Sequence, residues 1–185
     1  MSLLDILNNS SAAAFVGAFS AFFLVVANDW RRNKRKKKLI KLEIDIINRH
    51  ALNKMKTVIS NKNLLKDHNQ IVPAPIMKFP VHILTQLEVE VRDELTIDQK
   101  SAIDAITYTM EAIDELLESA YNITKQIMSA GKEDIQRIEH IERLLVDFED
   151  AIVNLGRLSE MCQKYIDCQY REIITKQYRR EDYIQ

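Results

Sequence analysis

The feature that most constrains this 185-residue chain is an uncharged apolar segment, residues 12–27, that runs into a dense block of basic residues. With its flank through Trp30 the segment reaches about 20 residues, the length that a helix needs to cross a bilayer. The only charge before it is Asp5, whereas a cleavable signal peptide carries positive charge there. We therefore predict that residues 1–30 hold an external N-terminus and one transmembrane helix, with a buried core helix as the alternative.

The basic block sets the predicted orientation of this span. Its members are Arg31, Arg32, Lys34, Arg35, Lys36, Lys37 and Lys38. The positive-inside rule places such a block in the cytoplasm, together with the rest of the chain. Blocks of this kind also attract anionic lipid headgroups, by about 1 kcal/mol per basic residue. RNA binding and nuclear targeting are the alternatives.

The apolar segment sorts its residues by size around a helix, which advances about 100° per residue. One stripe carries the smaller and polar residues Ala13, Gly17, Ser20, Ala21, Leu24 and Asn28. The opposite side carries Phe15, Phe19, Phe22 and Val26. Membrane helices associate through close packing of small residues, so we predict a homo-oligomer joined through the first stripe. In a ring of copies, Ser20 and Asn28 would face a central opening.

Composition favours long, uninterrupted elements over the rest of the chain. Only three glycines and three prolines are present, so few positions interrupt an element. Eight of the 26 basic residues lie between Arg31 and Lys41, and from residue 42 onward 25 acidic residues face 18 basic ones. A body of this charge disfavours a general nucleic-acid-binding surface.

Apolar spacing predicts a helical body of several elements. Residues 31–66 form a basic neck and stalk helix, with Leu39, Leu42, Ile46, Ile47, Met55, Val58 and Ile59 at near-helical spacing. Three prolines then predict an extended, apolar crossover over residues 67–82 that packs on the body. A short helix is expected over about 81–92. We place the helical body at residues 83–185.

Two long helices are predicted to form an antiparallel hairpin over about 97–130 and 133–178. Thr96 is the expected N-cap of the first helix and Gly131 its C-terminal stop. The expected core stripe of the first helix is Ile103, Ile106, Met110, Ile113, Leu117 and Ala120; that of the second is Ile138, Ile141, Leu145, Phe148, Ile152, Leu155, Cys162 and Ile166. The predicted fold class is all-α, a transmembrane helix that continues into an elongated cytoplasmic bundle.

The sequence offers little catalytic or metal-binding chemistry. The four histidines are scattered at His50, His68, His82 and His140. No two of them share a metal-binding spacing on one helical face, and no phosphate-binding glycine loop occurs. Cys162 and Cys168 lie six positions apart on the predicted helix, too far for a mutual disulfide, so we expect reduced thiols with one in the core. We predict no catalytic residues, no cofactor and no metal.

A span, a cationic neck and an all-α body in this order resemble the small membrane accessory proteins of type VI-B CRISPR systems. The resemblance implies a bacterial inner-membrane protein that assembles into a ring-shaped pore and strengthens RNA-guided antiphage defence by depolarising the membrane. It also implies a divergent HEPN-type body and a functional link to an RNA-guided nuclease. Active HEPN relatives cleave RNA with an Arg and a His separated by four to six residues. Arg137 and His140 have two residues between them, so the expectation is a protein that is not an enzyme.

Three functional hypotheses follow from these features. The first is a non-enzymatic pore or membrane-perturbing effector. The second is a membrane-tethered receptor whose body binds a nucleotide second messenger, and the third is a structural scaffold. A large residue at Gly17 or Ala21 should abolish pore function and leave a scaffold intact. Subunit number, gating signal and any RNA binding by the body are left open.

Overall fold

The computed structural model describes residues 10–74, 77–129 and 135–183, with the backbone alone for residues 10–17 and 135. By its internal contacts the chain divides into two units, residues 1–39 and residues 40–185. Throughout the described ranges the regular secondary structure is helical, which confirms the all-α prediction.

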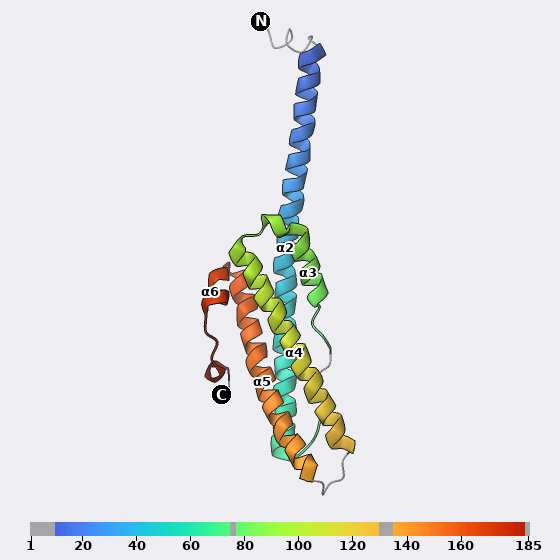
Figure 1. Cartoon of the computed structure of the whole chain (residues 1–185), viewed down its shortest axis with the longest axis vertical. Helices are drawn as coiled ribbons and strands as arrows, with labels where there is room; N and C mark the ends of the chain where they lie inside the picture. The colour runs from blue at the N-terminus through green and yellow to red at the C-terminus, as the bar shows by residue number, and fades with distance from the viewer. Residues whose placement is uncertain (1–9, 75–76, 130–134, 184–185) are drawn as a thin grey trace. The chain divides into compact units, whose positions relative to one another are not determined.

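The longest helices of the 40–185 unit lie side by side as a bundle (Figure 1). The α-helices are α2 (Ser10–His68), α3 (Val81–Val91), α4 (Ile97–Ser129), α5 (Ile135–Ile166) and α6 (Tyr170–Thr175); 3-10 turns cover Arg92–Glu94 and Arg180–Asp182. α4 and α5 form the predicted hairpin and pack extensively against each other. The connection that includes Gly131 lies outside the described residues.

Helix α2 buries one regular stripe within the 40–185 unit. Eight buried positions follow a heptad spacing of four and three residues: Ile40, Ile44, Ile47, Ala51, Lys54, Val58, Asn61 and Leu65. Asn48, next to Ile47, is buried as well. Among the residues whose near-helical spacing predicted the stalk helix, Ile47 and Val58 are buried, whereas Leu39 and Leu42 are about half exposed. The reason is register: Ile40 and Ile44 lie on the α2 face turned toward the bundle.

The proline-containing crossover packs on the bundle as expected. Ala74 and Phe79 are buried, and the Asn61 side chain donates a 3.0 Å hydrogen bond to the Pro73 carbonyl. Met77 is exposed, while Pro75 and Ile76 lie outside the described residues. Phe79 therefore anchors the segment just before α3 begins.

Helix α4 begins with a capping box, because its N-terminal donors need partners outside the helix. The Gln99 backbone N–H donates to the Thr96 hydroxyl at 3.2 Å, and the Thr96 N–H donates to the Gln99 side chain at 3.0 Å. The predicted N-cap is confirmed. All six residues of the predicted α4 core stripe are buried.

Helix α5 ends about ten residues earlier than the sequence pattern predicts. The Cys168 N–H donates to the Tyr165 carbonyl and the Gln169 N–H to the Lys164 carbonyl, while Cys168 has φ 63°. These two bonds and the left-handed residue form a Schellman motif, which terminates the helix at Ile166. The predicted continuation to residue 178 is wrong, because the chain turns here and starts α6.

The core stripe of α5 is shifted from the predicted one at its N-terminal end. Phe148, Ile152, Leu155 and Cys162 are buried as expected, but Ile138 is 61% exposed. Leu144 is fully buried, next to a partly buried Leu145. Two adjacent leucines satisfy the same helical periodicity, so packing against α4 decided between them.

Candidate functional site

An apolar sleeve, defined as residues 19–26 of α2, is the most unusual surface of the 1–39 unit. Its six large members are Phe19, Phe22, Phe23, Leu24, Val25 and Val26, each 47–71% exposed. Consecutive residues of a helix point in all directions, so apolar side chains cover every side of this segment. A soluble helix exposes apolar groups singly or hides them on one stripe, and this one does neither.

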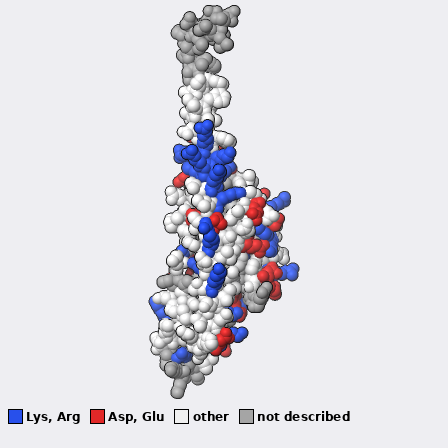
Figure 2. Space-filling model, turned by 180° about the vertical axis from the view of Figure 1, so that it is seen from behind, with Lys and Arg blue, Asp and Glu red and all other residues white. Residues whose placement is uncertain are grey.

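A basic collar, defined as residues 31–38, follows the sleeve on the same helix. Figure 2 shows its Lys and Arg side chains gathered next to an uncharged stretch. Among them, Arg31, Arg32, Lys34, Arg35 and Lys38 are exposed. Trp30 is exposed at the junction, where the Lys34 ammonium lies 5.0 Å from the centre of its ring. The collar thus concentrates positive charge directly beside an exposed aromatic side chain.

The residues of the predicted pore face fall partly within the described structure. Ser20, Ala21, Leu24 and Asn28 lie on α2 with exposed side chains. Ala13 and Gly17 belong to the described backbone of α2, but their side chains lie outside the description. In the described part of the chain, no helix holds a stretch both long and apolar enough to cross a membrane. The predicted transmembrane span begins at Ala12, whereas the first described side chain is that of Ala18. The transmembrane span therefore stays a prediction.

A buried ion pair links α2 to α4 inside the bundle. The Lys54 ammonium lies 3.0 Å from Oδ1 of Asp114, and the two side chains are 9% and 11% exposed. Oδ2 of Asp114 accepts a 2.7 Å hydrogen bond from the Phe79 N–H, and the Lys54 ammonium lies 3.9 Å from the centre of the Phe79 ring. Burial lowers the pKa of Lys54, and Asp114 opposes that effect. Lys54, Asp114 and Phe79, the interior clamp, hold the crossover against both helices.

One feature of the sequence, Lys54, signals the interior clamp, which the sequence-based predictions do not include. Lys54 occupies a position of the α2 heptad between Ala51 and Val58, where an apolar residue is the norm. A lysine at such a position requires a carboxylate partner, because an unpaired buried charge is costly. Nothing in the sequence identified Asp114 as that partner, since the two residues lie 60 positions apart.

A groove of about 840 Å³ opens between α3 and α4, on the outer side of the interior clamp. Its apolar part includes Phe79, Val81 and Val89. Five carboxylates line it: Glu90, Glu111, Asp114, Glu115 and Glu118. Lys78 and His82 are the other ionisable residues of its lining. The groove lining therefore combines apolar side chains with an excess of carboxylates over basic groups.

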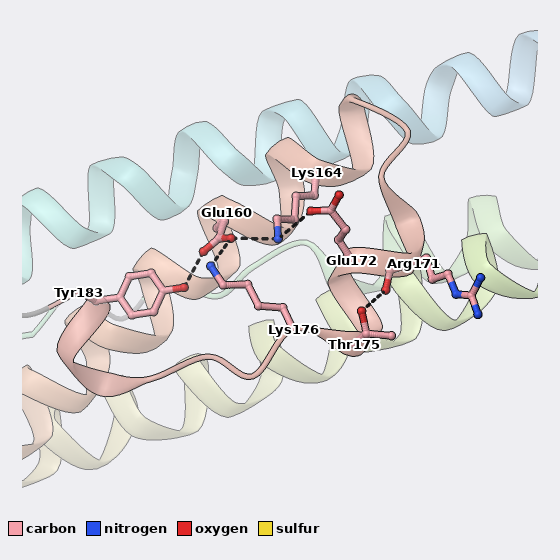
Figure 3. Close-up of polar contacts among 7 residues, drawn as sticks. All are labelled: Glu160, Lys164, Arg171, Glu172, Thr175, Lys176 and Tyr183. Atoms are coloured by element: carbon pink, nitrogen blue, oxygen red, sulfur yellow. Dashed lines mark hydrogen bonds and ion pairs between the residues drawn. The ribbon is translucent and has the colours of Figure 1, made fainter.

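A polar network fastens the C-terminal segment to α5 (Figure 3). The Glu160 carboxylate contacts the ammonium of Lys176 at 2.6 Å and that of Lys164 at 3.1 Å. The Tyr183 hydroxyl donates to its other oxygen at 2.7 Å. Burial raises the pKa of Glu160, but the hydrogen bonds from Lys176, Tyr183 and Lys164 outweigh it and lower the pKa to about 2. This constellation joins α5 to the residue that follows α6 and to Tyr183 near the C-terminus.

The two cysteines have opposite environments, and the predicted free thiols are confirmed. Cys162 is fully buried, and burial raises its pKa to about 12. Cys168 is exposed, and the Lys41 ammonium 2.9 Å from its sulfur lowers its pKa. Lys41 also donates to the Ile166 carbonyl at 3.1 Å, which is one of the free acceptors at the end of α5.

Within the described ranges, no three His, Cys, Asp or Glu side chains gather in a way that could hold a metal ion. His50, His68 and His82 are exposed, and His140 is partly buried on α5. The structure thus places the chain in the class of all-α helical bundles. No family model, curated protein or solved structure matches it.

Proposed function

We propose that this protein is a membrane-anchored helical bundle whose first helix inserts into a bilayer and whose copies assemble into a pore. The observation that carries the proposal is the exposed apolar sleeve next to the basic collar. Each Å² of apolar surface left in water costs about 25 cal/mol, so the sleeve is unfavourable in solution and favourable in lipid. Trp30 and the collar are the residue types expected at the headgroup level.

Insertion would use residues 12–30, which join the sleeve to the small residues that precede it. Phe19 and Phe22 suit contact with acyl chains. The stripe that contains Gly17 and Ala21 suits close approach of a second copy, because the association of helices in lipid depends on tight packing. Ser20 and Asn28 on the same stripe would then line the opening, and collars around its mouth would favour anions over cations.

A pore of this kind would dissipate ion gradients when it opens. In the defence setting that the resemblance implies, an RNA-guided nuclease would act upstream of opening. The nucleotide-receptor hypothesis gains no support from the groove between α3 and α4. Glu111, Glu115 and Glu118 would repel a nucleotide phosphate there.

Vesicle flotation and anion efflux with the full-length protein test the proposal. The wild-type protein should float with vesicles of phosphatidylcholine and phosphatidylglycerol and should release trapped chloride. Replacing Phe19, Phe22 and Phe23 together with Ser should abolish both, whereas Leu at the same positions should preserve flotation. A wild-type protein that does not float would overturn membrane anchoring.

The pore itself requires a separate comparison. Ala21→Leu should float like the wild-type protein but reduce efflux about tenfold, because a bulky residue on the small stripe separates the helices. Phe22→Leu on the opposite side is the matched control and should retain efflux. Equal efflux from both variants would overturn assembly through the small stripe, and no efflux from the wild-type protein would leave an anchored scaffold instead of a pore.

A further inference from the structure

The groove between α3 and α4 is lined by two rows of side chains with helical spacing, one on each helix. Val81, Thr85 and Val89 follow one another at four-residue intervals along α3. Glu111, Glu115 and Glu118 follow at four and three residues along α4, so this row extends over about 10 Å at 1.5 Å per residue. Rows with these intervals match the side chains of roughly two turns of another helix.

The Val89 end of the apolar row is available for contact, whereas Val81 is partly buried against the core. Val89 is 62% exposed although it is a β-branched apolar residue, and it lies in the groove lining. Leu84, about 140° around α3 from Val89 at 100° per residue, is buried against the bundle. The helix therefore presents apolar surface on two sides, and only one of them is covered by the chain itself.

The groove is preformed by the interior clamp. Asp114 accepts the hydrogen bond from the Phe79 N–H, and Lys54 lies over the Phe79 ring, so the segment that leads into α3 is fixed against α4. A site of fixed shape loses little conformational entropy when a partner binds. Both carboxylate oxygens of Asp114 are engaged in these contacts. The exposed carboxylates of Glu111 and Glu115 are the ones that can pair with a partner.

The charge at the edges selects the partner. Glu111 and Glu115 are exposed, and Glu118 pairs with Lys78 at 3.1 Å in a contact where both side chains are more than half exposed. An exposed pair of this kind contributes little, so an incoming cation can replace Lys78 at small cost. A ligand with basic groups at matching intervals and an apolar side fits both rows.

We propose that this groove docks a basic amphipathic helix of a partner protein. Leucine-like side chains of that helix would contact Val81 and Val89, while Lys or Arg side chains would pair with Glu111 and Glu115. The two rows favour a helix over a small cation, because a small cation needs only one carboxylate cluster and no apolar row of equal length. This surface belongs to the 40–185 unit, and its role is independent of membrane insertion.

Photocrosslinking with a synthetic helix tests the proposal on the full-length protein in dodecyl maltoside. The probe is a 14-residue Lys/Leu peptide with a central photoreactive residue, and a Glu/Leu peptide of the same length is its counterpart. We expect crosslinks of the Lys/Leu probe to map to residues 81–90 and 111–118. The Glu/Leu probe should give none, and raised salt should weaken the first signal.

Variants separate specific docking from general attraction. Glu111→Gln with Glu115→Gln should lower the affinity about tenfold, and Val89→Ser should lower it several-fold. Glu139→Gln with Glu142→Gln removes two exposed carboxylates from α5 and should change nothing. Equal losses in both double variants, or crosslinks spread over the bundle, would overturn the proposal. The proposal would also be overturned if spermidine displaced the Lys/Leu probe and Val89→Ser bound the probe as tightly as the wild-type protein. That result would indicate a site for small cations.

Discussion

The Lys54 ammonium of α2 and the Asp114 carboxylate of α4 lie 3.0 Å apart, with about nine-tenths of each side chain buried. The two residues are separated by 60 positions in the chain, so this contact closes the bundle across its interior. Because Asp114 also accepts the Phe79 N–H, one carboxylate holds α2, α4 and the crossover together.

The first prediction concerns the loss of this carboxylate. Asp114→Ala should lower the free energy of unfolding by about 3–5 kcal/mol, because it leaves the Lys54 charge buried and unpaired. Urea denaturation followed by circular dichroism measures the change. Lys78→Gln breaks the exposed pair with Glu118 and should leave the unfolding free energy unchanged within error.

A double variant distinguishes an unpaired charge from a simple loss of contacts. Lys54→Met combined with Asp114→Asn removes both charges, and the asparagine oxygen still accepts the Phe79 N–H. Stability should recover most of what Asp114→Ala loses, since buried pairs can be replaced by neutral groups of similar size. A double variant as unstable as Asp114→Ala would contradict this account.

The second prediction concerns Glu160 and acid. Its pKa falls from an ordinary 4.5 to about 2 in the folded protein, so its contribution is complete above pH 4.5 and disappears as the pH falls toward 2. Glu160→Gln should cost about 1–3 kcal/mol at pH 7, because hydrogen bonds to a charged group are lost. The difference between the two proteins should shrink below pH 4.5. A difference that is constant from pH 7 to 2.5 would exclude the ionised carboxylate as its cause.

The third prediction concerns Gly156 on α5. A Cβ atom added there would lie 2.6 Å from a carbon of the Tyr183 ring, which is too close for two carbon atoms that are not bonded to each other. Gly156→Ala should therefore displace Tyr183 and break its hydrogen bond to Glu160. The C-terminal segment should then be cleaved by trypsin at Arg179 and Arg180 several-fold faster, while α5 itself gains up to about 1 kcal/mol of helix propensity. Tyr183→Ala should show the same faster cleavage.

The fourth prediction concerns the two thiols. Cys168 should react with iodoacetamide at pH 7 at least about tenfold faster than Cys162, because it is exposed and its thiolate lies beside Lys41. Lys41→Gln should slow the labelling of Cys168 and shift its pH profile upward. Mass spectrometry of tryptic peptides separates the two sites. Preferential labelling of Cys162 would contradict the structure.

Much of the helical architecture follows from residue spacing alone. The α4 stripe from Ile103 to Ala120 is buried as predicted, because apolar residues at three- and four-residue intervals specify one face of a helix. Thr96 identified the start of that helix, since an N-cap bonds only to backbone groups a few residues away. The apolar segment that contains the sleeve and the basic block that forms the collar could also be recognised from the sequence, because each is a continuous stretch of the chain.

Contacts between distant residues were decided only by the tertiary structure. The pairing of Lys54 with Asp114 and the groove between α3 and α4 depend on which helices lie next to each other, and residue spacing carries no such information. The end of α5 at Ile166 belongs to the same class, because no glycine marks it and Cys168 takes the left-handed conformation instead. Local patterns determined the helices and their apolar faces, whereas packing decided which polar residues meet inside the bundle.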